Sequence, residues 1–291
     1  MQTIFSMVLS IYTFFVATEL YKKEYSEKIR ENVVSKEKIK PSVETGFHSF
    51  LKKYVIHTHS VYANIPCCVE AGKNLIEKIF IDEEIEPLWI KYTHPGFDLT
   101  KELMECLEEY RDEFGYDPEV IFLENHGLII TTDQAEDCIA LNTEVNQILR
   151  NYLNIEDEYP EVEIEEIEEQ KFVSKTQYLI DFFKRTEITE DYFENILYPD
   201  QIVYLEDDVA INSKDKDNKI NINTDNGEII YKANYKEAKT IDETLTAFIY
   251  IMDYIENSDL VLQTMPQKSI DLIKNMQAEK HRKKIMKEED E

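Results

Sequence analysis

The stretch YVIHTHSVYAN, residues 54–64, decides the fold, and ENHGL, residues 124–128, complements it later in the chain. Residues 54–56 are β-branched and aromatic, which is typical of a buried strand. Because successive side chains of a strand point to opposite faces, His57 and His59 are expected to project from the same side. Two imidazoles on one face suit a divalent metal ion, usually zinc held at about 2.0–2.1 Å.

A third histidine makes this pattern specific. His126 lies where an apolar run, residues 120–123, meets a His-Gly break and a second apolar run. Three protein nitrogens leave zinc an open position, which is typical of a catalytic site. The alternative is three core histidines hydrogen-bonded to their neighbours, the better interpretation for any one of them alone. We predict that His57, His59 and His126 are metal ligands and that Zn²⁺ is the cofactor.

These segments resemble the class II aldolase and adducin family, which carries a His-x-His strand and a later Asn-His-Gly-Leu segment. In that family the three histidines bind a catalytic zinc. The segment PSVETGFH, residues 41–48, is similar to the family's Pro-Ser-x-Glu-x-x-x-His segment. The segment YTHPGFDL, residues 92–99, matches the link between the zinc strand and the next helix. The resemblance covers about residues 13–155 and is looser from residue 198 onward.

The resemblance also implies roles for residues around the histidines. Glu44 matches the glutamate that takes a proton from the carbon next to the zinc-bound carbonyl. From the residues alone, a glutamate that complements a helix dipole explains Glu44 equally well. Ser42 and Asn64 are candidate substrate-binding residues, although strand packing explains Asn64 at least as well. His48, one helical turn after Glu44, matches a supporting residue.

The family fold is an α/β/α layered domain with a central, largely antiparallel sheet, and it is expected for residues 1–155. Residues 156–170 are acidic and lack a helical apolar period, which indicates an interdomain linker. Residues 171–291 are predicted to form a small α+β domain. Local patterns predict a helix over residues 67–80, a strand over residues 201–205 and a hairpin turn at Asp225-Asn226-Gly227.

Composition limits the partners and the compartment. The net charge of −28, from 60 acidic and 32 basic residues, would repel nucleic acid and anionic membranes, so neither is expected as a partner. The four cysteines show no C-x-x-C spacing, which favours reduced thiols in a cytoplasmic protein. Residues 4–17 are apolar, but no basic residue precedes them and they are short for a membrane span. A core element is therefore favoured over a signal peptide or an anchor.

The resemblance implies a zinc-dependent carbon–carbon lyase that acts on a ketose phosphate or related sugar, in a homotetramer with active sites between subunits. A sugar-phosphate 4-epimerase or dehydratase on the same zinc site, or a non-catalytic adducin-like module, are the alternatives. The family's Gly-Asn-containing start is missing here, and Val43 replaces one of two serines before the base. Both departures concern phosphate binding. We therefore expect an N-terminally shortened domain that binds zinc well and cleaves sugar phosphates poorly.

Overall fold

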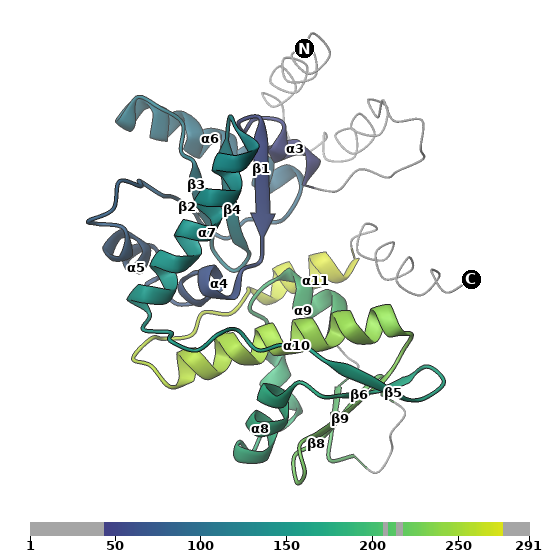
Figure 1. The fold of residues 1–291 in the computed structure, drawn as a ribbon. Helices are drawn as coiled ribbons and strands as arrows, with labels where there is room; N and C mark the ends of the chain where they lie inside the picture. Colours follow the sequence, from purple (N-terminus) through teal and green to yellow (C-terminus); the bar gives the residue numbers. More distant parts are fainter. Residues whose placement is uncertain (1–43, 206–208, 214–217, 276–291) are drawn as a thin grey trace. The chain divides into compact units, whose positions relative to one another are not determined.

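The computed structural model describes residues 44–205, 209–213 and 218–275 (Figure 1). The chain divides into two compact units. The first unit comprises Met1–His59 and Ile76–Ile148, and the second comprises Ser60–Leu75 and Leu149–Glu291. Each unit has its own sheet and its own cluster of buried apolar residues. The predicted boundaries at residues 155 and 170 stay a prediction.

The first unit contains a four-stranded sheet in the order β1-β4-β3-β2. β1 (Tyr54–Thr58) is antiparallel to β4 (Gly127–Thr132), and β4 is antiparallel to β3 (Val120–Leu123). β2 (Leu88–Ile90) is parallel to β3, because a helix of 18 residues connects them and returns the chain to the same end of the sheet. The predicted α/β class is confirmed, and the sheet is mixed, with two antiparallel pairs and one parallel pair.

One face of this sheet is covered by α6 (Phe97–Phe114) and α3 (Thr45–His48). As the sequence predicts, α6 buries one stripe of apolar residues at helical spacing: Leu99, Leu103, Leu107 and Tyr110. The helix ends at Gly115, whose φ of 82° is the left-handed conformation that glycine adopts without strain. The buried cluster on this face comprises Phe47, Ile90, Leu99, Leu103, Leu107, Ile121, Leu123 and Ile129.

The opposite face of the sheet is also covered. Strand alternation turns Phe122 away from the α6 face, and its ring packs against Phe80 with centroids 5.8 Å apart. Phe80 follows α5 (Gly72–Ile79). Cys138 of α7 (Ala135–Tyr152) donates a thiol hydrogen bond to the Ile130 carbonyl of β4. Both faces of the sheet are therefore covered.

The second unit contains a five-stranded mixed sheet. Its order is β5 (Ile164–Glu168), β6 (Lys171–Ser174), β9 (Glu228–Lys232), β8 (Ile220–Asn223) and β7 (Val209–Ile211). β7 and β8 are parallel and the other pairs are antiparallel. β8 and β9 are joined by the predicted Asp-Asn-Gly turn, in which Gly227 has a φ of 73°.

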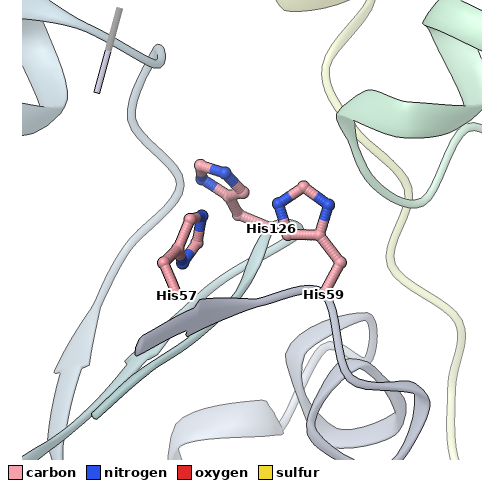
Figure 2. Close-up of side chains that lie close together, drawn as sticks. All are labelled: His57, His59 and His126. Atoms are coloured by element: carbon pink, nitrogen blue, oxygen red, sulfur yellow. The ribbon is translucent and has the colours of Figure 1, made fainter. Parts of the chain in front are cut away.

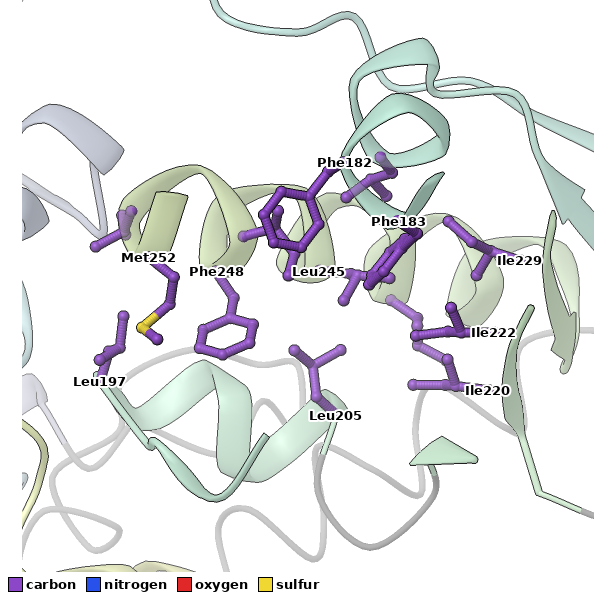
Figure 3. Packing of buried hydrophobic residues seen from close by; sticks show 14 of the residues in the cluster. Phe182, Phe183, Leu197, Leu205, Ile220, Ile222, Ile229, Leu245, Phe248 and Met252 are labelled. Atoms are coloured by element: carbon purple, nitrogen blue, oxygen red, sulfur yellow. The ribbon is translucent and has the colours of Figure 1, made fainter. Parts of the chain in front are cut away.

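Helices pack on this sheet around α10 (Tyr235–Glu256), which begins where the Asn234 side chain accepts a hydrogen bond from the Glu237 N–H at 2.8 Å. Figure 3 shows Phe183 of α8 (Gln177–Arg185) beside Ile222 and Ile229 of the sheet, and Phe248 of α10 beside Met252 and Leu205. The remaining helical elements are α4 (Val61–Cys67), α8 (Gln177–Arg185), η1 (Glu190–Glu194), α9 (Pro199–Tyr204) and α11 (Gln267–Asn275).

Residues 201–205 do not form the predicted strand. They belong largely to α9, with Leu205 as its C-terminal cap. Pro199 occupies the first turn of this helix, where its fixed φ and missing N–H are tolerated. The Gln201 side chain accepts a hydrogen bond from the Leu197 N–H at 2.6 Å and stabilises the entry into the helix. The strand preference of residues 201–205 is therefore outweighed by the helix start that Pro199 and the Gln201 side chain provide.

The helix predicted over residues 67–80 is instead two helices, α4 and α5. Ser60 stands at the N-cap of α4, so the helix starts earlier than predicted. Val69 then forms an isolated antiparallel bridge with Leu262, which takes its backbone out of helical geometry. The acidic run of residues 156–170 contains β5, which pairs with β6. Exposed glutamates on an edge strand need no apolar period, and they oppose pairing with other chains.

The apolar residues 4–17 and the candidate Ser42 lie outside the described residues. Within the part of the chain that the structure describes, no helix combines the length and the apolar character needed to cross a membrane.

Candidate metal centre

Three histidines meet at one end of the sheet of the first unit. His57 lies in β1, His59 directly follows β1, and His126 lies in the turn between β3 and β4. The ring centroids are 5.0–5.1 Å apart in all three pairs. One nitrogen from each ring can be chosen so that all three lie within 4.8 Å of one another. Figure 2 shows the three rings facing a common point.

The short turn between β3 and β4 places His126. Leu123 pairs with Gly127 across this turn, and the His126 N–H donates to the Leu123 carbonyl at 3.2 Å. Asn125 has a φ of 49°, a left-handed conformation that asparagine adopts more readily than most residues. The Asn-His-Gly sequence therefore suits a tight reversal that exposes one imidazole to the end of β1.

The His57 ring has a defined orientation. Its Nδ1 lies 3.1 Å from the Leu128 carbonyl oxygen, and because a carbonyl only accepts, Nδ1 carries the proton. Nε2 then presents its lone pair to the group of three histidines. This atom is buried and has no hydrogen-bond partner among the described residues. Fixing one ring nitrogen so that the other is free to coordinate is the usual arrangement of metal-binding histidines.

Glu44 completes the cluster. Its Oε1 lies 3.2 Å from His126 Nε2 and 3.5 Å from His57 Nε2. Although it stands at the N-cap of α3, its side chain makes no capping hydrogen bond and instead approaches the two imidazoles. Burial raises the pKa of Glu44, but the two imidazoles outweigh burial and lower that pKa well below its usual value.

Burial dominates the electrostatics of His126. It lowers the pKa of His126 to about 4, and Glu44 opposes this shift. Burial and the neighbouring His57 also lower the pKa of His48. With a pKa of about 4, His126 is neutral at pH 7, which is the form that binds a metal ion.

The residues present fit a transition-metal ion. His57, His59 and His126 could hold one through imidazole nitrogens, and nitrogen ligands suit zinc, copper, iron and nickel. The buried His57 Nε2 without a hydrogen bond supports this, since a buried polar atom without a partner is rare in a protein that binds nothing there.

Comparison with known proteins assigns a family to part of the chain. Residues 20–153 match the family described as the Class II Aldolase and Adducin N-terminal domain. This segment belongs to that family. The predicted family resemblance is confirmed over these residues, while the roles of Glu44 and of the three histidines stay predictions.

Two related proteins show the extent of the likeness. The uncharacterized oxidoreductase YuxG of Bacillus subtilis (strain 168) is 31% identical over 116 residues, which are 40% of this chain and 16% of that protein. The chain therefore matches only a small part of that relative. The N-terminal class II aldolase domain of a conserved protein from Thermoplasma acidophilum is 23% identical, with a TM-score of 0.41, over 49% of this chain and 62% of that one.

The class II aldolase and adducin segment also contains Asn64, the remaining candidate for substrate binding. Asn64 is fully buried in α4, which belongs to the second unit. Neither polar atom of its side-chain amide has a hydrogen-bond partner among the described residues. Its role in substrate binding stays a prediction.

Sequence reasoning missed two residues that follow His126 in this domain. The Leu128 carbonyl orients His57, and Gly127 lies against His59. Backbone carbonyls leave no signal in a sequence. The glycine directly after the third histidine was a visible signal, but its meaning depends on which strand lies beside it.

Proposed function

We propose that this protein is a zinc-dependent carbon–carbon lyase of the class II aldolase type that acts on a ketose phosphate or related sugar. One observation carries the proposal: three histidine nitrogens converge within 4.8 Å, and the buried Nε2 of His57 lacks a hydrogen bond. Family membership of residues 20–153 supports the same reaction class.

The histidines, Leu128 and Glu44 would have different roles in this reaction. His57, His59 and His126 would hold zinc, which when bound supplies a Lewis acid for a substrate carbonyl. Leu128 keeps Nδ1 of His57 protonated, so that Nε2 faces the site. The Glu44 carboxylate lies 3.2 Å from His126 Nε2 and would take the proton from the carbon beside the carbonyl.

The alternative functions differ in whether they need the three histidines. A 4-epimerase or a dehydratase would use the same three histidines, and a non-catalytic adducin-like module would have no need of them. The name of the Bacillus relative describes an oxidoreductase, but the match covers 16% of that protein. A sugar or sugar phosphate as substrate and a homotetrameric assembly belong to the proposal.

Replacing Glu44 with glutamine tests the proposal. We expect Glu44→Gln to retain zinc but to stop exchange of the substrate carbon-bound hydrogen with solvent deuterium, because an amide of nearly the same shape cannot accept the proton. NMR of a panel of ketose 1-phosphates in D₂O measures this exchange. The matched control is Glu119→Gln, since Glu119 in the same unit pairs with Lys52 and lies away from the histidines.

Exchange at the wild-type rate in Glu44→Gln would show that Glu44 is not the base. Purified wild-type protein without bound zinc, and unable to take it up, would remove the basis of the proposal.

A further inference from the structure

We propose that Gly127 is a positioning residue of the metal centre, because only a residue without a side chain lets β4 approach the end of β1 that carries His59. This inference rests on the proposed metal function. It concerns how the ligands are brought together, rather than which residues they are.

The space at Gly127 is too small for any side chain. A Cβ atom built there would lie 2.4 Å from the Thr58 carbonyl oxygen, 3.0 Å from His59 Cδ2 and 3.3 Å from His59 Cα. Contacts below 3.0 Å do not occur for real Cβ atoms. The nearest atom belongs to the backbone, so rotation of a side chain cannot relieve the overlap.

The need for glycine is one of space and not of backbone conformation. Gly96, Gly115 and Gly227 have positive φ angles, and Gly127 is not among the residues with this feature. Alanine could therefore adopt the backbone conformation of residue 127. The expected consequence of alanine is a displacement of the β1 end, where Thr58 and His59 lie.

The segment Gly127–Leu128 is in contact with every ligand of the site. Gly127 follows His126 in the chain and lies against His59, while the Leu128 carbonyl accepts the hydrogen bond from His57. Thr58 pairs with Leu128 in the sheet, so these contacts share one register. A shift between β4 and the end of β1 would therefore disturb the distances between all three imidazoles.

The turn before Gly127 cannot easily move away to make room. The Glu124 N–H donates to the Ile90 carbonyl at 2.9 Å, and a Glu124 carboxylate oxygen accepts from the Tyr92 N–H at 2.9 Å. These bonds tie the turn to β2 and to the residues that follow it. Because β3 and the turn are anchored, the displacement would fall on His59.

Zinc affinity of Gly127→Ala tests this inference. We expect zinc to bind roughly 10–100-fold more weakly, as is typical when a group that orients metal ligands is changed, and the fold to be kept. Competition with a chromophoric chelator measures the affinity, with Zn²⁺ alone as the probe. The visible spectrum of the Co²⁺-loaded protein reports the ligand geometry, and far-ultraviolet circular dichroism reports the fold.

Gly115→Ala is the matched control. Gly115 lies in the same unit and has a φ of 82°, so alanine is strained there, but no atom lies within 4 Å of the added Cβ. This variant should lose stability and keep the zinc affinity and the Co²⁺ spectrum of the wild type. Equal loss of affinity in both variants would assign the effect to general destabilisation and overturn the inference.

Other outcomes are also decisive. Unchanged zinc affinity in Gly127→Ala would overturn the inference, and so would a variant that does not fold, because the glycine would then serve the sheet and not the metal.

A second variant, Glu124→Ala combined with Gly127→Ala, releases the turn and should bind zinc more tightly than Gly127→Ala alone. A double variant that binds no better would contradict the anchoring by Glu124. A wild-type protein that binds no zinc would refute the proposed function instead.

Discussion

Two buried polar clusters among the described residues, one in each unit, differ in how well their hydrogen bonds are satisfied. In the second unit, the two carboxylate oxygens of Asp242 accept hydrogen bonds from the hydroxyls of Tyr231 and Thr176, each at 2.5 Å. All three side chains are buried. In the first unit, His57 Nε2 is buried beside His126 and Glu44 without a hydrogen-bond partner among the described residues.

The difference favours the histidine cluster as the one that binds a ligand. A buried polar group without a partner costs about 1–3 kcal/mol, so proteins rarely keep one without a use for it. The Asp242 cluster is complete by itself and links α10 to β9 and to the N-terminus of α8. A metal ion held by the three imidazoles would complete the histidine cluster. Burial alone would not separate a structural cluster from a binding site.

Removing two ligands should give the largest effect. His57→Ala combined with His126→Ala should lower zinc affinity on the order of a thousandfold or more, since zinc binding energy is shared among few ligands. Metal analysis of the purified protein measures the loss. His48→Ala is the control, because His48 stacks on Phe47 and lies outside the group of three. Stoichiometric zinc in the double variant would refute the site.

Removing the carboxylate of the Asp242 cluster should lower the free energy of unfolding and leave the zinc content unchanged. Asp242→Ala would leave the buried hydroxyls of Tyr231 and Thr176 without their acceptor, a destabilisation of about 2–5 kcal/mol. Urea unfolding measures the free energy of unfolding. Asp259→Ala, at an exposed aspartate of the same unit, should change it by less than about 0.5 kcal/mol. Loss of zinc in Asp242→Ala would contradict the division into structural and binding clusters.

Asn64 sharpens the comparison, because it is a buried group of the second unit without hydrogen bonds. Asn64→Leu has nearly the same shape and removes the unpaired amide, so the free energy of unfolding should stay the same or rise by about 1–2 kcal/mol. If the amide binds substrate, the KM for a ketose phosphate rises while stability does not fall. A loss of more than about 2 kcal/mol would show that the amide is hydrogen-bonded in solution, for example to a buried water.

The pH dependence of stability should give the smallest effect. Burial raises the pKa of Asp242 above its ordinary value, although bonds from Ser174, Thr176 and Tyr231 oppose the shift. The folded protein then holds this proton more tightly than the unfolded chain. The resulting stabilisation is present below the ordinary pKa of aspartate and is lost as the pH rises through the folded pKa.

Asp242→Asn removes this titration. The stability of the wild type relative to Asp242→Asn should therefore fall as the pH rises from about 3 toward neutrality, measured by urea unfolding at a series of pH values. A parallel pH dependence in the two proteins would show that the Asp242 pKa is not shifted.

The metal ligands and the first sheet could be predicted because their signals are local. Strand alternation places two histidines of a His-x-His segment on one side, and a His-Gly break between apolar runs marks a turn. Family resemblance then connected His126 with His57 and His59. The predictions of other elements were wrong for a physical reason. The run at residues 201–205 has strand-like composition, but Pro199 and the Gln201 side chain start a helix there.

The sequence by itself determined which residues bring the chemistry: three imidazoles, a glutamate and the family to which residues 20–153 belong. Only the tertiary structure decided that Glu44 faces the imidazoles and does not cap its helix, that the Leu128 carbonyl sets the tautomer of His57, and that Gly127 must lack a side chain. The physical reason is how far apart in the sequence the interacting residues lie. Residue type and spacing follow from neighbouring positions in the chain, whereas a carbonyl oxygen or a Cβ atom acquires its neighbours only when strands distant in sequence pair in one register.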